Sequence, residues 1–135
     1  MRRCNNFVKV VFVTLLLLVS VIVLKPLTVE AQSAQVVDKK VEDAILAEDW
    51  KKVADLLGSV DTETPSPVLR LIKGHACLAM NRNNESLCLF LSVSSDEERK
   101  EWEKWTHGFA DKNQKSAIAY YFKGDALARL ERWDS

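Results

Sequence analysis

Apolar residues recur at three- and four-residue spacing along most of the chain, which is the pattern of amphipathic helices. The first such stretch, Val36–Leu57, is interrupted once at Glu48–Asp49 and therefore predicts two short helices or one kinked helix. Gly58 is a helix stop, and the segment 61–67 contains two prolines, as expected of a loop. A further helix is predicted over Val68–Met80.

Three more helical stretches follow. Glu85–Val93 is short and strongly apolar, so a strand is the alternative, but leucine outnumbers β-branched residues there and favours a helix. Ser95, followed three residues later by Glu98, forms a capping box at the start of a helix that we expect to end near Gly108. Lys115–Ser135 predicts the last helix, so the expected fold class is all-α.

Residues 1–31 follow a different pattern. A basic start precedes the apolar run Val10–Leu24, and small or β-branched residues lead to Ala31, which is typical of a secretory signal peptide. The run is shorter than the roughly 20 apolar residues of a membrane span, although counting it over residues 7–24 brings it close. A cleaved signal peptide is therefore the first interpretation and an uncleaved N-terminal membrane anchor the second. Both place the rest of the chain outside the cytoplasm, in a periplasmic or extracellular location.

The leader changes the charge balance of the remainder. Of the 19 basic and 19 acidic residues, four basic and one acidic lie in residues 1–31, which leaves 15 basic and 18 acidic residues, a net charge of −3. Such a surface gives no indication of nucleic-acid binding. We expect a linker over 32–35 and a helical domain over 36–135, truncated at its C-terminus because the chain stops one step into a turn.

Two stretches of the helical domain are similar to each other. Leu71–Ala79 and Tyr121–Arg129 both carry an apolar residue, then Lys, Gly, a variable residue and Ala. Glycine inside a helix costs about 1 kcal/mol relative to alanine. We therefore expect Gly74 and Gly124 to be points where a neighbouring helix approaches closely.

These stretches resemble the tetratricopeptide repeat family, whose first helix carries a large residue, Gly-x-Ala and another large residue, and whose second helix carries a small residue and later an aromatic one. The spacing departs from the family, because Gly74 and Gly124 are 50 residues apart while the family period is about 34. The extra helix after Ser95 accounts for the excess. The matching positions are Ile72, Gly74, Ala76, Cys77, Ser86 and Phe90, then Phe122, Gly124, Ala126, Leu127 and Trp133, with Trp50, Val53 and Leu57 as the second helix of an earlier, degenerate repeat.

The resemblance implies antiparallel helical hairpins stacked as a short α-solenoid; an unrelated helical bundle is the alternative. A stack of this kind presents first helices on a concave face that binds a segment of another protein. The predicted function is thus an exported adaptor or scaffold without catalytic activity. The alternatives are an accessory repeat region of a larger exported enzyme and a membrane-anchored assembly factor. The positions predicted to face outward and contact the partner are Arg70, Lys73, His75, Asn81, Lys123, Asp125 and Arg129.

No active site, cofactor or metal is predicted. His75 and His107 stand apart from any nucleophile or orienting acid in the sequence, and there is no paired cysteine or histidine spacing of the metal-binding kind. Cys4 lies in the leader. Cys77 and Cys88 fall on consecutive helices, where a disulfide is one interpretation and two small core or surface residues the favoured one.

The helix after Ser95 carries two further features. Its carboxylates and basic residues alternate over 96–104, which favours surface pairing along the helix over a catalytic acid pair. Trp102, Trp105 and Phe109 form one stripe, for which burial in the core is favoured over stacking on a ligand.

Overall fold

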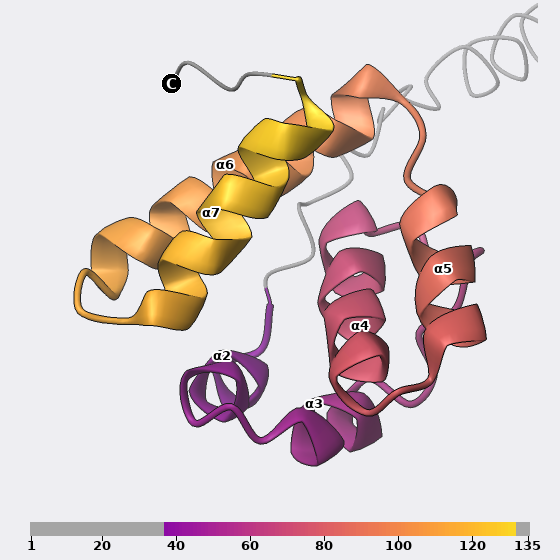
Figure 1. Cartoon of the computed structure of the whole chain (residues 1–135), viewed down its shortest axis with the longest axis horizontal. Coiled ribbons are helices and arrows are strands. Elements are labelled where there is room, and N and C mark those ends of the chain that lie inside the picture. The colour runs from indigo at the N-terminus through magenta and orange to yellow at the C-terminus, as the bar shows by residue number, and fades with distance from the viewer. Residues whose placement is uncertain (1–36, 132–135) are drawn as a thin grey trace, which may run out of the picture. The chain divides into compact units, whose positions relative to one another are not determined.

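The computed structural model describes residues 37–131, and every regular element in that range is an α-helix. The all-α prediction is therefore confirmed for these residues, and the strand alternative for Glu85–Val93 is wrong. The predictions for residues 1–31, for the linker 32–35 and for Trp133 fall outside the described range. The helices are α2 (Lys39–Leu46), α3 (Trp50–Leu56), α4 (Pro67–Ala79), α5 (Asn83–Leu91), α6 (Asp96–Lys112) and α7 (Ala117–Arg129), as Figure 1 shows.

Short polar side chains begin most of these helices. Each accepts a hydrogen bond from a backbone N–H of the first turn, a group that has no partner within the helix. At α6 the capping box is complete, because the Glu98 side chain also accepts from the backbone N–H of Ser95. Residue type therefore indicates these helix starts, whereas α5 begins after Arg82 without a side-chain cap. The capping residues are Asp38, Asp49, Ser66, Ser95 and Ser116.

Helix α4 is the centre of the described fold. It packs against α3, α5 and α6, and every residue from Pro67 to Cys77 is buried. Over Pro67–Cys77 the helix has no solvent face, so its polar side chains there must find partners inside the protein. Several residues of α4 that the sequence pattern predicted to be on the surface are therefore buried.

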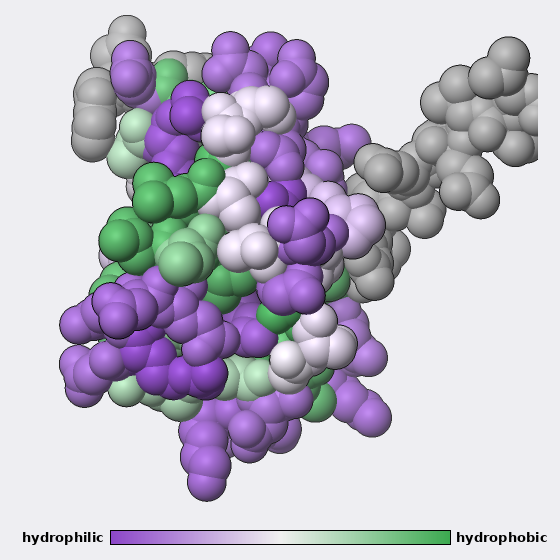
Figure 2. All heavy atoms as spheres, turned by 90° about the vertical axis from the view of Figure 1, so that its right-hand side faces the viewer, coloured by the Kyte–Doolittle hydropathy of each residue, from purple (hydrophilic) through white to green (hydrophobic). Residues whose placement is uncertain are grey.

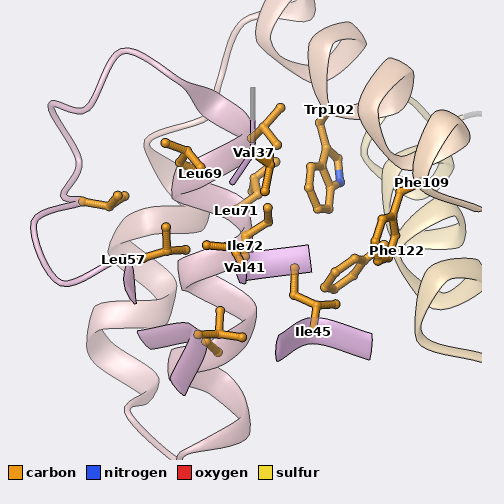
Figure 3. Close-up of a cluster of buried hydrophobic side chains, with 14 of the residues drawn as sticks. Val37, Val41, Ile45, Leu57, Leu69, Leu71, Ile72, Trp102, Phe109 and Phe122 are labelled. Carbon is orange, nitrogen blue, oxygen red and sulfur yellow. The ribbon is translucent and has the colours of Figure 1, made fainter. Parts of the chain in front are cut away.

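Helices α6 and α7 form an antiparallel hairpin, and α2 contacts both α3 and α7. Figure 3 shows Ile45 of α2 beside Phe122 of α7, with Trp102 and Phe109 of α6 close to them. These four side chains are almost completely buried, so the core interpretation of the α6 aromatic stripe is confirmed. The contact of α2 with α7 differs from a linear stack, in which each hairpin touches only the next.

The predicted end of α6 near Gly108 is wrong, because the helix continues to Lys112. Phe109 and Ala110 are buried against the rest of the core and hold the next turn in helical form. Gly108 lies on the exposed side, where it costs only its low helix propensity of about 1 kcal/mol.

The two matched glycines differ in their surroundings. A Cβ atom added to Gly74 would lie 2.5 Å from Cε1 of Phe90, so α5 does approach α4 closely at this point, as predicted. A Cβ atom added to Gly124 would meet nothing within 4 Å, and the prediction of a close contact there is wrong for the described residues. The reason is the direction of packing: α7 turns Phe122 and Ala126 toward the core and leaves Gly124 on the opposite side.

Candidate protein-interaction surface

Arg70 is buried and joins α4 to the beginning of α6. Its Nη1 donates to the backbone oxygen of Ser92 at 2.7 Å and to the Ser92 hydroxyl at 3.1 Å, and its Nη2 pairs with the carboxylate of Glu98. Burial raises the pKa of Glu98, but hydrogen bonds from Arg70 and from the backbone of Ser95 and Ser94 outweigh this, and the net pKa is lowered. Arg70 therefore serves the fold and is not free to bind a partner.

Lys73 is also buried. Its Nζ donates to the backbone oxygens of Gly58 and Val60, which follow α3, and lies 3.5 Å from Oε1 of Glu85 on α5. The ammonium group thus pairs with carbonyl oxygens of the loop that follows α3, which are polar groups that need partners when they are buried. One side chain of α4 fixes both neighbours, α3 and α5.

His75 lies where α4, α5, α6 and α7 meet, and its Nε2 is 3.4 Å from Oδ2 of Asp125. Its ring centroid is 4.9 Å from that of Phe90 and 5.5 Å from that of Tyr121. The rings of Trp102 and Phe122 complete its surroundings. The expectation that this position faces solvent is wrong, because α7 and α5 cover it.

Asp125 accepts two hydrogen bonds at this junction. Oδ2 accepts from Nε1 of Trp102 at 2.9 Å and from Nε of Arg129 at 2.7 Å. Burial raises the pKa of Asp125, but the contacts with His75 and Arg129 have the larger combined effect and lower the pKa from 3.8 to about 2. The carboxylate is thus held charged, and it links α4, α6 and α7.

The predicted set of outward residues is therefore corrected for Arg70, Lys73, His75 and Asp125, which contact other parts of the protein. Apart from the Asp125–Arg129 pair within α7, their partners lie on other helices or in loops distant in sequence, so helical periodicity could not reveal them. The remaining three residues of the set are at least partly exposed to solvent.

Asn81 is exposed at the α4–α5 turn, and Lys123 is half-buried. Arg129 is half-buried as well, since its guanidinium carbon lies 4.7 Å above the centre of the Phe90 ring. This cation–π contact joins α7 to α5. These three positions are dispersed and do not form a docking surface by themselves.

The exposed apolar residues gather elsewhere. On α5, Leu87 is 56 % and Leu91 is 69 % exposed. With Asn84 and Cys88 they occupy the spacing i, i+3, i+4, i+7, which is one continuous stripe of the helix, and all are exposed. Figure 2 views the protein from the right-hand side of Figure 1, where α5 lies, and shows a patch of hydrophobic residues on that side. We refer to Asn84, Leu87, Cys88 and Leu91 as the α5 face.

The sequence did not single out the α5 face. Its signal is visible in the sequence, because Leu87, Leu89 and Leu91 with Phe90 place apolar residues all round one short helix, and a helix of this kind is normally covered on every side. On the opposite side of α5, Ser86 and Leu89 are buried, as the repeat pattern predicted for Ser86. Phe90 covers Gly74, and Ala76 and Ala126 are fully buried.

The cysteines are free thiols among the described residues: Cys77 is buried in α4 and Cys88 is exposed on α5. Burial and the nearby Glu85 carboxylate raise the pKa of the Cys77 thiol, which keeps it protonated and unreactive. No group of three or more metal-binding side chains occurs within residues 37–131.

One surface hollow of the described part is close to the candidate surface residue Arg129. It lies between the first turns of α6 and the end of α7, has a volume of about 410 Å³, and is lined mainly by charged side chains such as Asp96, Arg99 and Lys100. Small-molecule sites are typically apolar clefts with a few polar groups. This hollow does not have that character.

No helix within residues 37–131 has the length and apolarity needed to cross a bilayer. Comparison with protein-family models, with curated proteins and with solved structures gives no match.

Proposed function

We propose that this chain is an exported protein-interaction module that docks a partner protein through the α5 face. The observation that carries the proposal is the exposure of Leu87 and Leu91, at 56 % and 69 %, on a helix whose opposite side is buried. Leaving two leucines one turn apart in water costs free energy that a partner would recover. The stripe spacing is the one by which a helix packs against another helix.

The chemistry of the α5 face favours a protein over other partners. None of its four residues is charged, so nucleic-acid phosphates have no attraction to it. It is also a ridge on a helix, whereas small molecules bind in concave pockets. Charged groups lie at its edge, where Arg82 pairs with Glu85, and this arrangement of an apolar centre with a polar rim is typical of protein interfaces.

The hairpin formed by α4 and α5 supports a tetratricopeptide-like organisation. Its tight helix contact at Gly74 and Phe90 and its short turn are features that the resemblance implies. The stacking of further hairpins into an α-solenoid, and the role of adaptor or scaffold without catalytic activity, belong to the proposal. The location outside the cytoplasm rests on the sequence pattern of residues 1–31.

The test places a photo-crosslinking amino acid at Leu91, and as a matched control at the exposed Lys104 of α6, in cells that produce the full chain. We expect a discrete crosslinked species from position 91 and none from position 104. The double substitution Leu87→Ser and Leu91→Ser, probed from a crosslinker at Asn84, should remove the species. Because both leucines are exposed, the fold should keep its stability to within about 0.5 kcal/mol. Equal crosslinking at both positions, or a species that survives the double substitution, would contradict the proposal.

A further inference from the structure

Helix α7 has apolar residues on two opposite sides. One side, with Ala119, Phe122 and Ala126, is buried in the core. The other side follows the spacing i, i+3, i+4, i+7, i+10, i+11, is exposed or half-buried, and has no charged member. Helices that are apolar all round are normally covered on all sides. We call this second side the outer face of α7; it consists of Ala117, Tyr120, Tyr121, Gly124, Leu127 and Ala128.

Helix α4 shows how such a face is covered. With the 50-residue offset of the internal repeat, Gly124 corresponds to Gly74 and Leu127 to Cys77. In α4 this side is covered by α5: the Phe90 ring lies in the space above Gly74, and Glu85 lies beside Cys77. The outer face of α7 is therefore the same side of a similar helix, and no second helix from residues 37–131 covers it.

The lysine before each glycine extends the comparison. Lys73 lies 3.5 Å from the Glu85 carboxylate of α5. Lys123 forms no ion pair with any of residues 37–131. Residues 37–131 thus place neither the corresponding acid nor the corresponding aromatic ring beside α7.

The two helices also end in the same way. Asn81 follows α4 with φ of 59°, and Glu131 follows α7 with φ of 58°. The backbone N–H of Asn81 donates to the oxygen of Leu78, and that of Glu131 donates to the oxygen of Ala128, both at 3.0 Å. Both ends lie at the same 50-residue offset as the two glycines, although the left-handed turn itself is a common helix ending that α2 also has, at Glu48.

We propose that the outer face of α7 docks an amphipathic helix from another polypeptide, packed on α7 as α5 packs on α4. The helix carries an aromatic residue that covers Gly124 and, five positions before it, an acidic residue that pairs with Lys123, as Phe90 and Glu85 do on α4. This is a second docking surface in addition to the α5 face. It does not depend on the docking of a partner there.

Within residues 37–131 no helix covers this face, since Gly124 is exposed and an added Cβ atom would meet nothing within 4 Å. A second copy offers no suitable helix either, because its own Phe90 covers its own Gly74. Two α7 helices packed about Gly124 in two-fold symmetry would bring Lys123 close to the same residue of the second copy, and like charges oppose that contact.

The experiment uses a peptide of residues 82–93, the α5 sequence, held helical by a hydrocarbon staple on its α5-face side. A benzophenone side chain replaces Phe90 in the peptide, which is added to the full 135-residue chain. After irradiation, we expect mass spectrometry to locate the crosslink on α7. Gly124→Leu should weaken peptide binding by about tenfold, because the new side chain occupies the place of the aromatic ring.

Two controls make the result specific. Gly108→Leu is the matched variant, since Gly108 is also an exposed helical glycine with nothing within 4 Å of an added Cβ atom; it should leave binding unchanged. Lys123→Glu should weaken binding, and a peptide with Glu85→Lys should restore it. Circular dichroism of both leucine variants should be that of the unaltered chain.

Three results would overturn the proposal. The first is a crosslink on α4, which would mean that the peptide only exchanges with α5. The second is an equal loss of binding in the Gly124 and Gly108 variants, or no binding at all. The third is self-association of the full chain in sedimentation that Gly124→Leu abolishes, because this face would then bind a second copy. The α5-face crosslinking described above reports separately on the proposed function.

Discussion

Gly74 and Gly124 occupy equivalent places in two similar helices, yet a methyl group should have opposite effects at the two positions. At Gly74 the added Cβ atom would lie 2.5 Å and 2.8 Å from two atoms of the Phe90 ring. The ring is confined by His75 and by Arg129, so α5 must move. The resulting strain of about 1–3 kcal/mol exceeds the gain of about 1 kcal/mol in helix propensity.

We therefore expect Gly74→Ala to lower the melting temperature and Gly124→Ala to raise it, the latter by about 4–8 °C for a stabilisation of about 1 kcal/mol. Thermal unfolding followed by circular dichroism measures both changes. Adding Phe90→Leu to Gly74→Ala should recover part of the lost stability, since the shorter side chain leaves room for the new Cβ atom. A stabilising effect of Gly74→Ala would show that the ring moves away freely.

Asp125 gives a prediction about pH. Its pKa is lowered from 3.8 to about 2 in the folded protein by His75 and Arg129, while the unfolded chain keeps the ordinary value. The carboxylate therefore stabilises the fold fully above about pH 4, and this contribution of about 2 kcal/mol is lost as the pH falls from about 4 to about 2. Asp125→Asn should be less stable at pH 7 by a similar amount.

The measurement is the free energy of unfolding in urea at several values between pH 2 and pH 7. The difference between the unaltered chain and the Asp125→Asn variant should shrink toward low pH. Asp111→Asn, at an exposed position of α6, is the control and should change stability little at any pH. A difference that stays constant with pH would contradict the electrostatic explanation.

Between elements, the ion pair of Arg70 and Glu98 makes the position of α6 depend on α4. The Arg70 side chain is 6 % exposed and the Glu98 side chain 28 %. Glu98→Gln would leave the buried guanidinium without its counter-charge, and we expect a loss of about 3 kcal/mol. The neighbouring Glu97 belongs to the same first turn and is exposed, so Glu97→Gln should cost less than about 0.5 kcal/mol. Urea unfolding at pH 7 measures the loss of stability in each variant. Similar losses in the two variants would contradict a special role of the Arg70–Glu98 ion pair.

Helix positions were predictable because their signals are local. The Ser95–Glu98 capping box and the Ser66–Pro67 start each act within one turn of chain. The surroundings of α4 were not predictable, because burial of Lys73 depends on backbone oxygens 13 and 15 residues away. A lysine in a helical pattern indicates the surface unless its partners are known.

The sequence also failed to show which apolar residues are exposed. Leu87 and Leu91 have the composition of core residues, and only the arrangement of neighbouring helices shows that they are exposed. Gly124 was expected to contact a helix because Gly74 does, but sequence likeness gives no information on whether the second helix is there. The likeness of α4 and α7 thus predicted a close helix contact correctly at Gly74 and, for the described residues, wrongly at Gly124.

Among the described residues, five of the six helices contact one another in a ring. α2 packs on α3, α3 on α4, α4 on α6, α6 on α7, and α7 on α2. Trp50 of α3 adds an edge contact to Phe122 of α7, with ring centroids 6.4 Å apart. A linear array of hairpins gains and loses stability locally, from one neighbour to the next. A closed order couples the first helix directly to the last.

Ile45→Ala distinguishes these two cases. Ile45 is fully buried between α2 and α7, and its truncation should cost about 2–5 kcal/mol. In the closed arrangement, amide hydrogen exchange should speed up in α7 as much as in α2, because both belong to one cooperative unit. In a linear array, the loss would be concentrated in α2 and α3 and would fade toward α7. Leu46→Ala, at the exposed neighbouring position, is the control for shortening a side chain of α2 without opening the core, and it should leave exchange in α7 unchanged.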